Sequence, residues 1–215
     1  MSQLYPLFLK LEGLLCGVVG GGMVAQRKAR ALLDCGARVR MIAPEATEEL
    51  RALESEGKIE WVRRQYQEGD LAGLRLVVAA TDEAEVNSAV RSEASERDVL
   101  CNVVDQRDLC DFYVPAVIQR GDLKIAISTN GKSPELAKAL RDLLEQRIGE
   151  DVGRVVEEAG KLREAIRHLM PDSAAGRMHL LRNLVRANEL IEALEQGDRK
   201  KTEAIVESWK SFLSD

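Results

Sequence analysis

Short apolar runs alternate with segments in which apolar residues recur every three or four positions through the first 113 residues. Recurrence at that interval is typical of a helix that buries one face, whereas a short apolar run between turn residues is typical of a buried strand. This order predicts repeated β-α-β units and a parallel sheet with right-handed crossovers. The predicted strands span residues 14–19, 38–43, 58–62, 74–80 and 99–104, and the predicted helices span residues 23–35, 47–56 and 82–97.

The pattern changes after residue 113. Apolar runs at 112–118 and 123–129 are separated only by the four residues 119–122, which predicts a hairpin with its turn at those residues. Ser133-Pro134 then predicts the start of a helix that ends near Ile148, because serine is a good N-cap and proline fits the first helical turn.

From Glu150 to the end the chain has a helical pattern, which we expect Gly153, Gly160, Pro171 and Gly197 to interrupt. Such a pattern predicts a small bundle that packs on itself or on a partner subunit. The sequence therefore predicts an α/β fold in three parts. These are a Rossmann-like parallel sheet over residues 1–113, a small α+β segment over 114–148 and a helical domain over 149–215.

A glycine cluster follows the first predicted strand. Gly20, Gly22 and Ala25 fit the G-x-G-x-x-G/A spacing. In that motif the first glycine permits a sharp turn, the second lets a diphosphate approach the backbone, and the third position lets the helix pack closely on the strand. The N–H groups at the start of the helix also favour phosphate. This context favours a dinucleotide site, and a turn without a ligand is the alternative.

Parallel sheets bind ligands beyond the carboxyl ends of their strands, so the residues that follow each strand are expected to meet in one crevice. After the second strand the acid that usually holds the ribose comes late, behind Pro44. No basic residue occupies the position of a 2′-phosphate partner, which favours NAD over NADP. The candidate cofactor-binding residues are Gly20, Gly21, Gly22, Met23, Val24, Ala43, Pro44, Thr81 and Asp82.

Asp105 follows the last predicted strand of the sheet and is the candidate catalytic residue. A carboxylate at that edge would accept a proton from a substrate while a hydride leaves for the nicotinamide. An aspartate that forms a turn or caps a helix is an equally good interpretation.

Ser133 and Lys132 are candidate substrate-binding residues at the start of the later helix. Free N–H groups, a hydroxyl and an ammonium together suit a substrate carboxylate. Simple capping of the helix by Ser133 is the commoner role for a serine at this position.

The composition narrows the classes of function. The chain has 215 residues, of which 45% are apolar, and its net charge of −5 argues against nucleic-acid binding. It has no apolar run of about 18 residues and no signal-peptide pattern, so we expect no membrane span and a cytoplasmic location.

The four cysteines lack C-x-x-C spacing, which predicts reduced thiols, with Cys16 and Cys101 buried in strands. Both histidines lie in the helical tail, so no metal ligands are assigned.

Four motifs occur in one order along the chain: residues 18–28, residues 79–82 with Val86-Asn87, residues 102–105 and residues 125–134. Together they resemble the N-terminal module of siroheme synthases, the precorrin-2 dehydrogenase and sirohydrochlorin ferrochelatase family, over roughly residues 3–147. The helical tail resembles the family in length and character more than in motif.

The resemblance implies that NAD⁺ accepts a hydride from precorrin-2 to give sirohydrochlorin, and that bifunctional members then insert Fe²⁺ as a substrate metal to make siroheme. It implies that Asp105 serves dehydrogenation and, where present, chelation. Asn102 in the third motif is a further candidate for substrate binding, and the family's helix-start serine falls on Ser133. The resemblance also implies a homodimer formed through residues 114–148. Because precorrin-2 carries many carboxylates, local Lys and Arg are expected near the cleft.

Two other functions are alternatives. A non-catalytic NAD-binding regulatory module would also begin with a glycine-rich turn, but it would usually keep the acid after the second strand and would not need residues 102–105 or 129–134. An NAD-dependent dehydrogenase of a smaller substrate is the second alternative.

Overall fold

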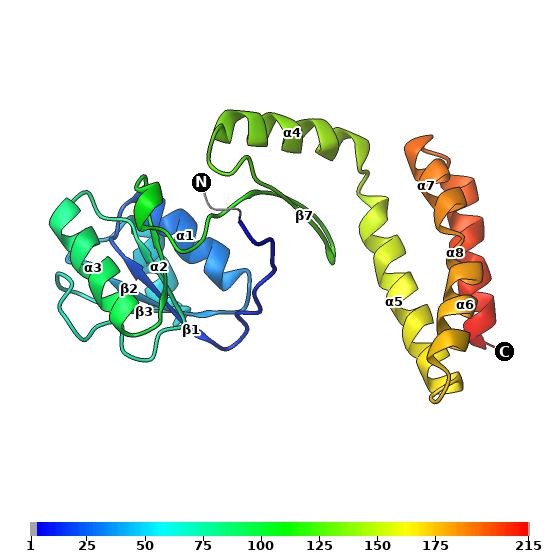
Figure 1. Ribbon diagram of the computed structural model, residues 1–215, viewed down its shortest axis with the longest axis horizontal. Helices are drawn as coiled ribbons and strands as arrows, with labels where there is room; N and C mark the ends of the chain where they lie inside the picture. The colour runs from blue at the N-terminus through cyan, green and yellow to red at the C-terminus, as the bar shows by residue number, and fades with distance from the viewer. Residues whose placement is uncertain (1–3, 215) are drawn as a thin grey trace. The chain divides into compact units, whose positions relative to one another are not determined.

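The computed structural model describes residues 4–214, which divide into two compact units with their boundary between Val114 and Pro115 (Figure 1). The finer division at residues 113 and 148 stays a prediction. The first unit contains β1 (Leu15–Val19), α1 (Met23–Leu33), β2 (Arg38–Ile42), α2 (Glu48–Ser55), β3 (Ile59–Val62), β4 (Leu76–Ala79), α3 (Ala84–Glu96), β5 (Leu100–Val103) and a short 3-10 helix, η1 (Arg107–Leu109).

The five strands form one sheet in the order β3-β2-β1-β4-β5, and every neighbouring pair is parallel. The chain builds outward from β1 through β2 to β3 and then crosses to β4 and β5 on the other side of β1. The predicted Rossmann-like parallel sheet is therefore confirmed.

Each face of the sheet is covered by its own apolar core. Helices α1 and α2 cover one face, and α3 with the segment between β3 and β4 covers the other. Strand β4 is buried along its whole length, as its continuous apolar run predicts. The first core includes Ala25, Ala29, Leu32, Leu50 and Leu53, and the second includes Leu71, Leu74, Val90 and Ala94.

The second unit begins with an antiparallel hairpin of β6 (Ala116–Arg120) and β7 (Leu123–Ile127), followed by α4 (Pro134–Arg147). The prediction of a four-residue turn is wrong, because Arg120 pairs with Leu123 and leaves only Gly121-Asp122 in the turn. Gly121 has a φ of +55°, and a two-residue hairpin turn needs positive φ in its centre.

The rest of the second unit consists of α5 (Asp151–Leu169), α6 (Ala174–Val185), α7 (Ala187–Glu195) and α8 (Arg199–Ser214). They enclose an apolar core around Trp209, whose side chain is fully buried. The indole Nε1 of Trp209 donates a hydrogen bond to the Leu184 carbonyl at 2.7 Å. The predicted helical bundle therefore has its own core.

The predicted interruptions of these helices are partly wrong. Gly153 and Gly160 lie inside α5, whereas α6 ends at Arg186, whose φ is +47°. A Cβ at Gly153 would lie 2.9 Å from the carbonyl carbon of Arg120, so this glycine permits close packing on the hairpin. The break at Arg186 has neither glycine nor proline to mark it.

The cysteines agree with the sequence-based prediction. Cys16 in β1 and Cys101 in β5 are buried, and all four cysteines are free thiols. Burial raises the pKa of Cys101 to about 11, so its thiol stays protonated at neutral pH. Within residues 4–214, no helix combines the length and the apolar character needed to cross a membrane.

Candidate cofactor and catalytic site

The carboxyl ends of four strands lie in one row of the sheet. Val19 at the end of β1 pairs with Ile42 of β2 and Ala79 of β4, and Ala79 pairs with Val103 of β5. The direction in which the sheet grows reverses between β1 and β4, and open parallel sheets bind ligands at such a switch point. The structure thus brings the glycine turn, Ala43-Pro44, Thr81-Asp82 and Asp105 to one edge of the sheet.

The three glycines after β1 have different reasons to be glycine. Gly20 has a φ of +120°, and a Cβ there would lie 2.4 Å from the Ala80 carbonyl oxygen. A Cβ at Gly21 would lie 1.9 Å from the Glu45 carbonyl oxygen. At Gly22 the φ is −81° and a Cβ would meet nothing within 4 Å. The fold therefore requires glycine at positions 20 and 21 but not at 22, where close approach of a ligand would require it.

The start of α1 is suited to an anion. Gly22 is the N-cap and has no side chain to cap the helix. The first helical hydrogen bond runs from the Gln26 N–H to the Gly22 carbonyl at 3.0 Å, which leaves the preceding N–H groups of the first turn for a ligand. The first turn contains no acidic residue. The residues present therefore fit the diphosphate of a dinucleotide.

The loop after β2 is fixed to the glycine turn. The Thr47 N–H donates to the Gly21 carbonyl at 3.0 Å, and the Thr47 hydroxyl donates to the Gln26 side chain at 2.6 Å. The Trp61 indole N–H donates to the Ala43 carbonyl at 2.9 Å. These bonds fix the loop that contains the predicted cofactor residues Ala43 and Pro44.

The turn after β4 depends on a buried asparagine. Asn87 is 4% exposed, and its Nδ2 donates to the Thr81 carbonyl at 2.9 Å. The Thr81 hydroxyl donates in return to Asn87 Oδ1 at 2.9 Å and accepts from the Glu83 N–H at 3.2 Å. The pair sets the backbone of the turn that contacts Gly20. Sequence reasoning quoted Asn87 only as part of a motif and did not find this role.

Asp105 is exposed in a turn after β5 and has a φ of +60°. Aspartate adopts this left-handed conformation more readily than most residues, and strained positions of this kind cluster at functional sites. The N-cap of η1 is Gln106, without a side-chain cap, so Asp105 does not cap that helix. Within residues 4–214 its carboxylate has neither a hydrogen bond nor an ion pair. Of the two structural roles expected for Asp105, the turn is observed and the helix cap is not, and its catalytic role stays a prediction.

The loop that contains Asp105 is tied back to β5. The Asn102 amide donates to the Phe112 carbonyl at 2.9 Å, and the Cys101 N–H donates to the Asp111 carboxylate at 2.9 Å. Asp111 also pairs with Arg91 at 2.5 Å. Asn102 is 8% exposed, so its side chain has a structural part in holding this loop.

The remaining predicted residues belong to the second unit. The Ser133 hydroxyl accepts from the Leu136 N–H at 3.2 Å and caps α4, as the capping interpretation predicts. The Thr129 hydroxyl donates to the Ser133 carbonyl at 2.9 Å and accepts from the Ser133 N–H at 3.1 Å. The Lys132 side chain is exposed. Contact of Asn102, Lys132 or Ser133 with a substrate stays a prediction.

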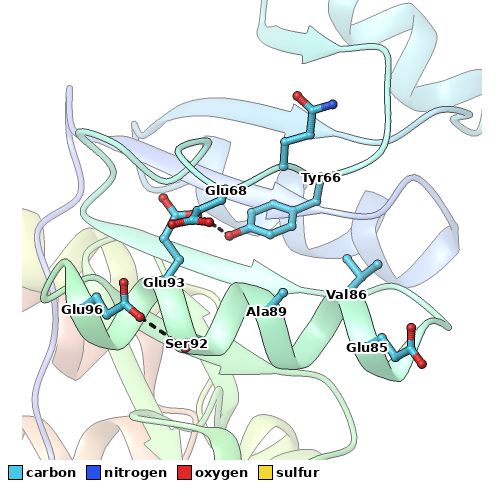
Figure 2. Close-up of a pocket in the computed structure, with 9 residues that line it drawn as sticks. Tyr66, Glu68, Glu85, Val86, Ala89, Ser92, Glu93 and Glu96 are labelled. Atoms are coloured by element: carbon cyan, nitrogen blue, oxygen red, sulfur yellow. Dashed lines mark hydrogen bonds between the residues drawn. The ribbon is translucent and has the colours of Figure 1, made fainter.

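A separate cavity of about 550 Å³ lies between α3 and the segment after β3. Figure 2 shows that Tyr66 and the glutamates at positions 68, 85, 93 and 96 line it, and that Tyr66 donates a hydrogen bond to Glu93. Its acidic lining opposes a diphosphate. Across the described part of the chain, no group of three or more His, Cys, Asp and Glu side chains is arranged to hold a metal ion.

The sheet order and the glycine turn define a dinucleotide-binding protein of the Rossmann class. Residues 7–116 match a family described as NAD(P)-binding, and residues 120–147 match the family of the central part of sirohaem biosynthesis proteins. The first match covers about half of the chain. The chain therefore belongs to this NAD(P)-binding family, and its central part matches the sirohaem biosynthesis proteins that the resemblance predicts.

Curated relatives agree with these matches. The chain is 39% identical to siroheme synthase 3 of Aeromonas hydrophila over 203 residues, and 40% identical to the siroheme synthase of Pseudomonas aeruginosa over 202 residues. Each alignment covers 94% of this chain but 43% of the relative, so the chain spans less than half the length of these relatives. Among solved structures, SirC, a precorrin-2 dehydrogenase, is 27% identical with a TM-score of 0.77, covering 97% of this chain and all of SirC.

Proposed function

We propose that this protein oxidises precorrin-2 to sirohydrochlorin with NAD⁺ as the oxidant, as one step of sirohaem synthesis. The observation that carries the proposal is the open space at Gly22, on the same sheet edge as the unpaired carboxylate of Asp105. The likeness to SirC, which spans nearly the whole chain, supports the choice of substrate.

Two groups of residues would hold the cofactor. Gly22 and the first N–H groups of α1 bind the diphosphate, because the helix start is positive and free of side chains. The fixed turns at Ala43-Pro44 and Thr81-Asp82 border the two ends of the dinucleotide site. When bound, NAD⁺ supplies the hydride acceptor.

Asp105 acts as the base. Oxidation of precorrin-2 removes a hydride and a proton, and the carboxylate of Asp105 takes that proton from the macrocycle and later releases it to water. The left-handed turn at position 105 and the bonds that tie its loop to β5 fix the backbone from which this carboxylate extends. Asn102, Lys132 and Ser133 are proposed to contact the substrate.

We propose Fe²⁺ insertion into sirohydrochlorin as a second activity, with iron as a substrate. The curated relatives named siroheme synthase support it. In this step the incoming metal displaces two N–H protons of the macrocycle, of which Asp105 accepts one and water accepts the other. An assay of sirohydrochlorin with Fe²⁺ under anaerobic conditions tests it, and an unchanged sirohydrochlorin spectrum would contradict it.

We also propose a homodimer in the cytoplasm. Helix α4 exposes an apolar stripe at Leu136, Leu140, Leu143 and Leu144, of which the first is 52% and the third 50% exposed. Their spacing puts them on one side of the helix, as in a packing face. The double variant Leu140→Glu with Leu144→Glu should be monomeric in sedimentation, with Lys138→Glu as the matched surface control. A wild-type monomer would contradict the proposal.

The main test incubates the purified protein with precorrin-2 and NAD⁺. We expect the absorption spectrum of sirohydrochlorin to appear with stoichiometric NADH. Binding of NAD without turnover would instead favour the non-catalytic regulatory module.

A further inference from the structure

Lys28 lies on the flank of α1 opposite to the one that contacts α2. Residues 26 and 28 are about 200° apart around a helix axis. The side chains of Gln26 and Arg30 both donate to Glu49 of α2. Lys28 is therefore directed toward the other side of α1, where the loop after β5 follows the sheet edge.

The loop after β5 packs on this same side of the sheet. Val104 and Phe112, which flank Asp105, contact the apolar core beneath α1 and α2. The charges agree with this placement, because both Asp105 and Cys110 act electrostatically on the Lys28 ammonium. Lys28 and Asp105 therefore lie near one another, on different elements, at the candidate site.

The Lys28 side chain is half-buried. Within residues 4–214 it makes no hydrogen bond or ion pair, although its exposure is only intermediate. Burial lowers the pKa of Lys28, Arg27 lowers it further, and Cys110 and Asp105 oppose the shift. A partly desolvated cation that makes no ion pair gains interaction energy when an anion binds directly beside it.

We propose that Lys28 binds a carboxylate of the tetrapyrrole substrate and so determines which carbon of the macrocycle lies beside Asp105. This inference rests on the proposed function. A ring with acidic side chains around its whole rim can enter a site in several orientations, and a cation carried by helix α1 at one side selects among them. Lys28 is a positioning residue here, and Asp105 remains the base.

Lys28 is too far along α1 to serve the diphosphate. It follows Met23, the first helical residue, by five positions, a rise of about 7.5 Å, whereas the N–H groups that bind phosphate lie in the first turn. The affinity for NAD is therefore expected to be independent of this side chain.

The test compares Lys28→Met, Lys28→Arg and Arg27→Met. Methionine keeps the unbranched stem and removes the charge, so we expect KM for precorrin-2 to rise about tenfold with kcat within about twofold. Arginine restores the charge and should recover most of the lost affinity. Arg27 is exposed on the same helix and also removes one positive charge, so Arg27→Met is the matched control, with KM within about twofold of wild type.

Two measurements distinguish failure of the proposed role of Lys28 from failure of the proposed function. Wild-type turnover of precorrin-2 tests the function itself. Fluorescence titration with sirohydrochlorin measures tetrapyrrole binding without turnover, and Lys28→Met should bind it about tenfold more weakly, with unchanged Tm and NAD affinity. Equal affinity of the variant and the wild type for sirohydrochlorin, or a loss confined to NAD, would overturn the role of Lys28.

Discussion

Replacing Gly22 with aspartate is expected to change the affinity for NAD without lowering the stability of the fold. Position 22 has a φ of −81° and a ψ of −175°, which any residue adopts, and a Cβ there meets nothing within 4 Å. It is also the N-cap of α1, where aspartate is slightly better than glycine. The added charge favours the helix start by about 0.3–1 kcal/mol. We therefore expect Gly22→Asp to unfold with a free energy equal to that of the wild type or about 1 kcal/mol higher.

The same substitution should abolish cofactor binding. A carboxylate about 4 Å from one phosphate charge costs about 4 kcal/mol at an effective dielectric constant of about 20. That energy corresponds to roughly a thousandfold rise in Kd for NAD. Gly22→Ala adds the volume without the charge and should weaken binding much less.

Calorimetric titration with NAD⁺ and urea unfolding of the same samples check both halves of this prediction. Undiminished NAD affinity in a folded Gly22→Asp protein would show that the diphosphate does not approach position 22. A large loss of stability would show that the space at Gly22 is needed by the fold, and the assignment of this glycine to a ligand would fail.

Three further substitutions test other positions of the first unit. Gly21→Ala should lower the free energy of unfolding by about 3 kcal/mol in urea titrations, because its Cβ would overlap the Glu45 carbonyl oxygen at 1.9 Å; wild-type stability would contradict this. Asp105→Asn tolerates the left-handed turn, so Tm and NAD affinity should persist while kcat for precorrin-2 falls at least about a hundredfold; retained turnover would remove Asp105 from the mechanism. The Arg64 guanidinium lowers the pKa of Asp70 in the folded protein. The ionised Asp70 carboxylate therefore contributes fully to stability above its unfolded-state pKa of about 3.9, and this contribution is lost as the pH falls through the lower folded-state pKa. Asp70→Asn should therefore flatten the acid limb of stability measured against pH, and an unchanged limb would refute the assignment.

The sheet and its helices were predictable because burial leaves a local pattern. Strands β1 and β4 are apolar runs, and the helices of the first unit repeat apolar residues at the helical interval. The element boundaries that were predicted wrongly depend on contacts and backbone conformations that the local sequence does not show. Leu74 is as apolar as its neighbours but lies before β4, in the segment that covers the sheet. The turn at Arg186 places a non-glycine residue at positive φ, which the sequence does not signal.

The residues of the candidate site were likewise predictable only where a local motif marks them. The motif identified Gly20 and Gly22 by spacing, but the constraint on Gly21 comes from the Glu45 carbonyl, which the fold brings to it. The roles of Asn87 and Lys28 likewise depend on contacts between elements. Short-range spacing therefore predicted where the site lies, whereas the side chains that fix or complete it required the fold.

The distribution of paired and unpaired charges supports the choice of this sheet edge. Elsewhere in the first unit, Asp70 and Asp111 each accept an arginine, and buried Glu93 accepts Arg97, the Tyr66 hydroxyl and two backbone N–H groups. Asp105 and Lys28 have opposite charges and lie near each other, yet within residues 4–214 neither is paired. Because these carboxylates are held by protein partners whereas Asp105 and the half-buried Lys28 are not, we infer that the partners of these two residues are a proton and a carboxylate of a ligand.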